Sequence, residues 1–153
     1  MDTKAFKDMM SKWASGVAIV TTADDGNPYG ITVSSFISLT VTPPSVLISI
    51  DMSSPIVNAI KKAKRFALTI LRDDQTEVSK TFASHSINKF DNIGKSMYEG
   101  LPYIDGLVTI FVELKDTKEA YDHVLFMGDV IDGHTGEGRP LLYWNRDYRA
   151  FQY

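Results

Sequence analysis

The chain has 153 residues, of which 44% are hydrophobic and 11% aromatic, enough for one domain with a core of its own. Its formal net charge of -3 argues against a nucleic-acid or membrane partner, because both favour a basic face. No cysteine is present, which excludes disulfides, iron–sulfur clusters, thiolate zinc sites and cysteine nucleophiles. The sequence shows no signal peptide and no transmembrane stretch, so we expect a single cytoplasmic domain over residues 1–153.

Residues 3–13 predict an amphipathic helix. Their large apolar side chains recur at spacings of three and four residues: Phe6, Met9, Met10 and Trp13. We expect this apolar side to pack in the core, as the apolar face of a helix ordinarily does.

Runs of β-forming residues follow, separated by turn sequences and by few helices. They occupy residues 17–22, 29–39, 45–50, 66–71, 106–114 and 123–131. The first two form a hairpin about the turn at 24–28, and a charged bend at 115–119 separates the last two. Short strands punctuated by turns favour a mainly β, α+β fold with an antiparallel, Greek-key-like barrel over a parallel sheet wrapped in helices.

Two short helices interrupt these strands. The Ser-Ser-Pro sequence at 53–55 is typical of a helix cap followed by proline at the first helical position, so we expect a helix over 55–63. Residues 74–83 predict a second helix, and a polar loop follows it over 84–100. The closing segment 140–153 is extended and rich in aromatics and arginine, and we expect it to pack on another surface, of which a partner subunit is one candidate.

Motifs of metal, phosphate-loop and hydrolase sites are missing. His85, His123 and His134 are scattered, and no carboxylate accompanies them at ligand spacing, so we expect no metal. The glycine-rich segment 133–138 lacks the Lys-Ser/Thr of a phosphate loop and runs into Pro140, which indicates a hairpin loop. No serine stands in a Gly-x-Ser-x-Gly elbow.

Small hydroxyl side chains group on one predicted strand and the segments after it. They are Thr32, Ser34, Ser35, Ser49, Ser53 and Ser54. Each one alone is most simply a strand threonine or a turn serine. As a group facing the start of a helix, they offer hydroxyl and backbone N–H donors suited to a phosphate and a polyhydroxyl chain. A ribityl phosphate has this chemistry.

Short motifs also run in order along nearly the whole chain. The first half carries Trp13-Ala14-Ser15-Gly16-Val17, Gly30-Ile31-Thr32-Val33-Ser34-Ser35-Phe36 and Pro43-Pro44-x-Val46-Leu47-Ile48-Ser49-Ile50. The second half carries Gln75-x3-Ser79-x2-Phe82-Ala83, Lys89-Phe90, Asp122-His123, Gly128-Asp129-Val130 and Gly138-Arg139-Pro140. In order and spacing, these motifs resemble the short-chain flavin reductases with an FMN-binding split barrel.

The resemblance implies a split β-barrel, a homodimer, and a flavin near the subunit boundary. The residues implied to bind the cofactor are Thr32, Val33, Ser34, Ser35, Ser49, Ile50, Asp51, Ser53, Ser54, Phe82, Ala83, Lys89 and Phe90. Lys89 would supply positive charge, the alternative being an exposed, solvated lysine. His123 is implied as the catalytic residue near the nicotinamide, the alternative being a structural strand-end histidine. The glycine usual before this Asp-His pair is replaced by Tyr121.

The function implied by the resemblance is that of an NAD(P)H-dependent flavin oxidoreductase. FMN, with FAD as an alternative, would take electrons from NADH or NADPH and pass them to free flavin, an acceptor protein or a partner oxygenase. Two other functions stay open at this point. One is a non-catalytic FMN-binding electron-carrier module that another protein reduces, and the other is a split-barrel interaction domain without flavin.

Overall fold

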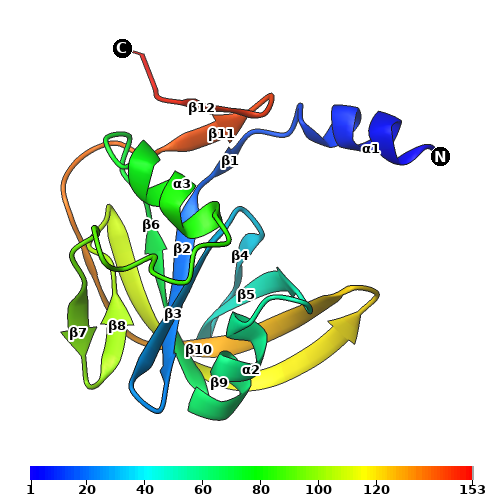
Figure 1. Cartoon of the computed structure of the whole chain (residues 1–153). Coiled ribbons are helices and arrows are strands. Elements are labelled where there is room, and N and C mark those ends of the chain that lie inside the picture. Colours follow the sequence, from blue (N-terminus) through cyan, green and yellow to red (C-terminus); the bar gives the residue numbers. More distant parts are fainter. Residues whose placement is uncertain (153) are drawn as a thin grey trace.

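A seven-stranded antiparallel sheet, in the order β3-β2-β6-β9-β10-β5-β4, forms the body of the molecule (Figure 1). The computed structural model describes residues 1–152. The strands are β2 (Ala18–Asp24), β3 (Asn27–Val33), β4 (Phe36–Val41), β5 (Pro44–Asp51), β6 (Arg65–Ile70), β9 (Val108–Ala120) and β10 (His123–Thr135). The two edge strands, β3 and β4, are consecutive in sequence and joined only by Ser34 and Ser35. This arrangement is the antiparallel split barrel that the sequence predicts.

Apolar side chains from the strands fill the interior of the barrel. Phe66 and Phe126 are fully buried there, and the helix α2 (Ile56–Ala63) adds Ile56 and Ile60 to the same cluster. Burying side chains of this size contributes about 1.5–3 kcal/mol each. This core therefore fixes β5 and the start of α2, which carry part of the candidate site.

A second apolar cluster lies on the other face of β2, under the helix α3 (Thr76–Ala83). Ile19 belongs to this cluster, whereas its neighbours Ala18 and Val20 face the barrel interior, as the alternation of a strand requires. Phe82 is fully buried in the cluster, and Phe90 from the following loop packs beside it. The outer face of the sheet thus holds α3 and anchors the loop after it.

Two smaller sheets complete the fold. β1 (Ser15–Gly16), β11 (Leu142–Trp144) and β12 (Asp147–Arg149) form one of them, so part of the carboxyl-terminal segment is a hairpin. β7 (Ser96–Tyr98) and β8 (Leu101–Tyr103) form the other. β7 lies inside the segment predicted to be a polar loop, because the ring of Tyr98 stacks on Phe111 with centroids 3.9 Å apart and draws that segment onto the sheet.

The bend predicted at 115–119 is wrong. β9 continues through this segment and pairs with the first residues of β10, with a shift of register at Lys115 and its charged side chains exposed to solvent. The loop predicted at 133–138 is also partly strand, since β10 runs to Thr135. A β-carbon at Gly133 would lie 2.8 Å from the Thr109 carbonyl oxygen, so glycine there permits the close approach of β9.

The predicted amino-terminal helix exists as α1 (Thr3–Met10), but its apolar side does not pack in the core. No residue of α1 is buried, and the side chains of Phe6 and Trp13 are 52% and 78% exposed. Figure 1 shows α1 projecting from the barrel beside β1 and β11. The turn that follows α1 is attached to the β11–β12 turn: Lys12 Nζ donates to Asn145 Oδ1 at 2.7 Å, and Asn145 N donates to the Ser11 carbonyl at 2.8 Å. Periodicity predicted the helix correctly, yet it does not reveal what covers the apolar side.

Within residues 1–152, no helix is long and apolar enough to cross a membrane. In the same part of the chain, no three His, Asp or Glu side chains are grouped so that they would hold a metal ion.

Candidate functional site

Ser34 and Ser35 lie where the strand predicted over 29–39 is interrupted, between the end of β3 and the start of β4. Ser35 Oγ donates to the Ser49 carbonyl at 2.5 Å, and Ser49 N donates to the Ser35 carbonyl at 3.3 Å. These contacts hold the β3–β4 connection against β5. Ser34 is exposed, and among the described residues its hydroxyl has no hydrogen-bond partner.

His123 lies at the same corner of the barrel because β10 pairs with β5. The register places His123 opposite Asp51 and Leu125 opposite Ser49. His123 Nδ1 lies 2.8 Å from Asp122 Oδ1, and the imidazole is half-exposed. The fold therefore brings the Asp122-His123 pair close to the serine residues of the β3–β4 connection and β5, although the sequence separates them widely.

Asp51 closes the turn that leads from β5 to α2. Its Oδ1 accepts hydrogen bonds from Ser53 N at 2.8 Å and Ser53 Oγ at 2.7 Å. These bonds, and then the charge of His123, lower the pKa of the Asp51 carboxyl. Asp51 is therefore an anion at neutral pH, and it occupies both donors of Ser53.

The cap predicted for α2 is wrong. The helix begins at Ile56, Pro55 takes the cap position, and no side chain caps the first turn. Asp51 holds Ser53 in the preceding turn, and Ser54 uses its backbone carbonyl to accept from Val57 N at 3.1 Å. Within the described chain, the Ser54 hydroxyl is left without a partner, next to an uncapped helix start.

Two of the predicted binding residues offer only backbone atoms. The side chains of Val33 and Ile50 are buried in the barrel core, at 7% and 2% exposure. Thr32 faces the other side of β3, where its Oγ1 donates to the Ser79 carbonyl at 2.6 Å. Ser79 is buried, and its hydroxyl lies 2.8 Å from the Tyr148 hydroxyl.

Phe82, Ala83, Lys89 and Phe90 gather against the outer face of β3. Phe82 and Phe90 pack edge to face with their centroids 5.0 Å apart, and Ala83 is exposed at the end of α3. A β-carbon on Gly30 would lie 2.3 Å from Phe82 Cε1, so this packing needs glycine at position 30.

Lys89 fastens the loop after α3 to the sheet. Its Nζ donates to the Gly30 and Phe82 carbonyls, both at 3.0 Å. Burial lowers the pKa of the ammonium, which has no carboxylate partner among the described residues. Lys89 is therefore not the solvated surface lysine of the simpler reading, and one of its three hydrogens remains free for a ligand.

The prediction of site residues missed Gly30 and Ser79. Both stand in the motifs that carry the family resemblance, so their positions were visible in the sequence. Their roles depend on contacts across the fold, namely the Phe82 ring over Gly30 and the Thr32 hydroxyl on Ser79.

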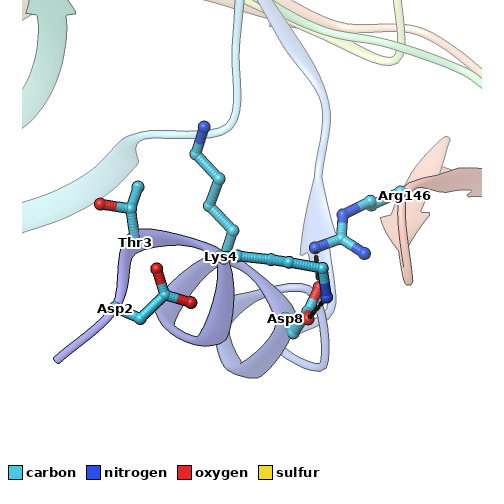
Figure 2. A pocket seen from close by; sticks show the side chains of 6 residues that line it. Asp2, Thr3, Lys4, Asp8 and Arg146 are labelled. Carbon is cyan, nitrogen blue, oxygen red and sulfur yellow. Dashed lines mark hydrogen bonds and ion pairs between the residues drawn. The ribbon is translucent and has the colours of Figure 1, made fainter.

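An open cavity of about 560 Å³ lies away from these residues, between α1 and the β11–β12 turn (Figure 2). Asp8 accepts hydrogen bonds there from Arg146 and, at 2.7 Å, from Lys4 Nζ. The cavity lining includes none of the predicted site residues. We read it as the cleft left where α1 is attached to the body.

Comparison with known proteins identifies one family. A family model described as a flavin reductase like domain matches residues 10–152. The reductase component of a Rhodococcus opacus 4-nitrophenol 4-monooxygenase/4-nitrocatechol 2-monooxygenase is 34% identical over 152 residues, covering 99% of this chain and 82% of that protein. An NADH:riboflavin 5'-phosphate oxidoreductase of Streptomyces pristinaespiralis is 32% identical, covering 96% of this chain and 87% of that protein.

Solved structures agree with these matches. The flavin reductase PheA2 in its native state superposes with a TM-score of 0.92 at 32% identity, covering 100% of both chains. A Streptomyces globisporus NADH:FAD oxidoreductase, solved with NAD and FAD fragments, gives a TM-score of 0.94 at 26% identity, covering 99% of this chain and 93% of that one.

Proposed function

Since this chain belongs to the flavin reductase-like family and is an NAD(P)H-dependent flavin oxidoreductase, we propose that FMN is its flavin and that it binds at the corner described above. The single observation that carries this proposal is the convergence of the Ser34–Ser35 connection, the end of β5, the start of α2 and His123. A relative that acts on riboflavin 5'-phosphate supports FMN. FAD, named for another relative, is the alternative.

The donors at the corner fit a ribityl phosphate. Among residues 1–152, the hydroxyls of Ser34, Ser49 and Ser54 have no protein partner, and α2 begins without a side-chain cap. Unpaired N–H groups at a helix start favour an anion. Because the Asp51 carboxylate already holds Ser53, we assign the phosphate to Ser54 and the first turn of α2 and not to Ser53.

The protein's contribution is position and electrostatics, while the flavin, when bound, supplies the electron-accepting ring. Because a carboxylate only accepts hydrogen bonds, Nδ1 of His123 carries the hydrogen toward Asp122 and leaves Nε2 for the carboxamide of the nicotinamide. Lys89 contributes positive charge from the loop that Phe90 fastens over the outer face of β3, and we propose that its free hydrogen also serves the phosphate.

We also propose that the chain is a homodimer. An eight-residue helix with no buried residue is too short to be stable without a partner, and α1 is such a helix. β4 is an uncharged edge strand on which Ile37, Leu39 and Val41 are exposed, Val41 at 83%. In a two-fold dimer, α1 of one copy covering β4 of the other would bury both surfaces twice. β4 directly follows Ser34 and Ser35, so a partner subunit that packs on β4 would also line the proposed flavin site.

The acceptor is proposed to be a partner oxygenase in the cytoplasm. Several relatives are reductase components of two-component monooxygenases, among them the Rhodococcus opacus protein and a Mycobacterium tuberculosis reductase subunit. The charge and composition of the chain suit a protein acceptor, not a nucleic acid or a membrane.

The test is to titrate the purified protein with FMN, FAD and riboflavin, and then to add NADH or NADPH without air. Tightest binding of FMN, followed by bleaching of the flavin absorbance by the nicotinamide, is the expected result. Binding without bleaching would favour the electron-carrier alternative. Failure to bind any of the three flavins at micromolar concentration would remove the flavin site.

A further inference from the structure

Tyr121 combines a strained backbone with a fully exposed side chain. It occupies the first position of the two-residue loop between β9 and β10 with φ 57°, in the left-handed region. Residues with a β-carbon adopt this region at a cost in free energy, and a bulky residue there is an outlier. The side chain is 102% exposed, so no packing offsets this cost.

Other hairpin loops of the chain place different residues in this conformation. The first loop positions between β2 and β3, β7 and β8, and β11 and β12 hold Asp25 at φ 48°, Glu99 at φ 46° and Asn145 at φ 52°. All three are polar, and Asn and Asp are the residues that tolerate the left-handed region best after glycine. Among the described non-glycine residues with positive φ, Tyr121 is the one aromatic.

The position of the Tyr121 loop connects it with the candidate site. Tyr121 is two residues before His123, which pairs with Asp51. Met52 N donates to the Asp122 carbonyl at 2.9 Å, so the loop is fastened to the turn between β5 and α2. Backbone strain next to a candidate binding site, at a residue whose side chain does not stabilise the fold, indicates a role in binding a ligand.

We propose that Tyr121 is a specificity-determining residue whose ring stacks on the adenine base of the nicotinamide dinucleotide. The proposal rests on the proposed function, which provides the substrate. A dinucleotide carries two planar rings, and His123 is assigned to the nicotinamide. Adenine is the ring left for an exposed aromatic farther out on the same loop. Tyrosine stacks on a base with little loss of side-chain entropy, and this interaction strengthens binding measurably.

Two substitutions separate the ring from the backbone. Tyr121→Asn relieves the strain and removes the ring, whereas Tyr121→Phe keeps the ring. Glu99→Asn is the matched control, because it relieves a similar backbone position in another hairpin. We expect both asparagine variants to raise the melting temperature. Only Tyr121→Asn should raise the KM for NADH, roughly tenfold, with kcat nearly unchanged, and weaken NAD⁺ binding in calorimetry to the same degree.

Reduced nicotinamide mononucleotide, which lacks adenine, completes the test. Its KM should be the same for the wild type and Tyr121→Asn. An unchanged KM for NADH, or an equal rise for both substrates, would overturn the role in adenine stacking. If the wild-type protein oxidises neither NADH nor NADPH with any flavin, the proposed function fails first and the inference falls with it.

Discussion

His123 on β10 and Asp51 on β5 lie opposite each other in the antiparallel ladder, and Asp122 Oδ1 lies 2.8 Å from Nδ1 of the imidazole. The sequence places His123 far from the predicted flavin residues, which suggested that it would affect the nicotinamide reaction while contributing little to flavin affinity. The strand register shows that this separation in sequence is not a separation in space, because the imidazole and the β5–α2 turn lie at the same corner. Both effects therefore have to be measured on the same variant.

His123→Ala should slow the reduction of bound flavin by NADH roughly 10²-fold, since a misplaced nicotinamide transfers electrons poorly. FMN affinity should change much less, because Ser34, Ser49 and Ser54 remain. Stopped-flow single turnover gives the rate, and fluorescence titration gives the affinity. The half-exposed ring packs in no core cluster, so the melting temperature should stay constant. A lower melting temperature with an unchanged reduction rate would make His123 a structural strand residue.

Lys89→Ala should weaken FMN more than riboflavin, which lacks the phosphate. A hydrogen bond to a charged group is worth roughly 1.5–3 kcal/mol, so the dissociation constant for FMN should rise about ten- to hundredfold. The bonds from Lys89 to the Gly30 and Phe82 carbonyls also fasten the loop, and their loss should weaken both flavins slightly. Equal weakening of FMN and riboflavin would move Lys89 from the phosphate to the ring.

The preference for FMN over riboflavin should also decline at alkaline pH. Burial lowers the pKa of Lys89, so its positive charge is present below that pKa and lost as the pH rises through it, earlier than for an ordinary lysine. In the protein without flavin, the same lowered pKa makes the folding stability change with pH in the opposite direction. The unfolded chain binds more protons between the two pKa values, so stability from this group rises with pH there. Flavin titrations and urea unfolding across the alkaline range check the two trends.

Gly30→Ala should destabilise the protein by about 1–3 kcal/mol, because the new β-carbon meets the Phe82 ring in a filled cluster. The melting temperature should fall by roughly 2–4 °C for each kcal/mol. Gly16→Ala is the matched control, since nothing lies within 4 Å of the β-carbon it would gain. Equal stability of the two variants would contradict the packing of α3 on β3.

Phe6→Ser combined with Trp13→Ser should convert the dimer to a monomer, because it removes two large exposed apolar side chains of α1 and the turn after it. Ile87→Ser is the control, since Ile87 is an exposed apolar residue in the loop after α3, outside the proposed interface. Sedimentation analysis over a wide concentration range, with flavin present, gives the oligomeric state. A wild-type monomer under these conditions would contradict the dimer, as would a dimer that the double substitution leaves intact.

Much of the barrel follows from the sequence, because β-branched runs and turn residues predict most strands of the central sheet. Two of the errors arise because pairing with another strand or ring, and not local composition, decides the structure of the segment. Tyr98 becomes part of a strand through Phe111, and the charged residues of β9 stay in a strand through their pairing with β10.

The candidate site divides in the same way. Residue types and family motifs select segments far apart in the sequence, and the fold brings Ser35, Ser49 and His123 from these segments to one corner. Which hydroxyls are free is a different question. The hydroxyls of Thr32, Ser35 and Ser53 donate hydrogen bonds to oxygens of the protein. Neither the identity of these residues nor their spacing in the sequence predicts these bonds.

Ser34 and Ser35 directly connect the two edge strands, β3 and β4, of the seven-stranded sheet. Any motion that separates β3 from β4 must displace these two residues, so opening of the barrel would also distort the proposed flavin site. A ligand held there opposes that opening and raises the heat stability of the whole sheet by mass action. Conversely, substitutions that destabilise β3 or β4 far from the corner should weaken flavin binding, although they change none of the groups proposed to contact the flavin.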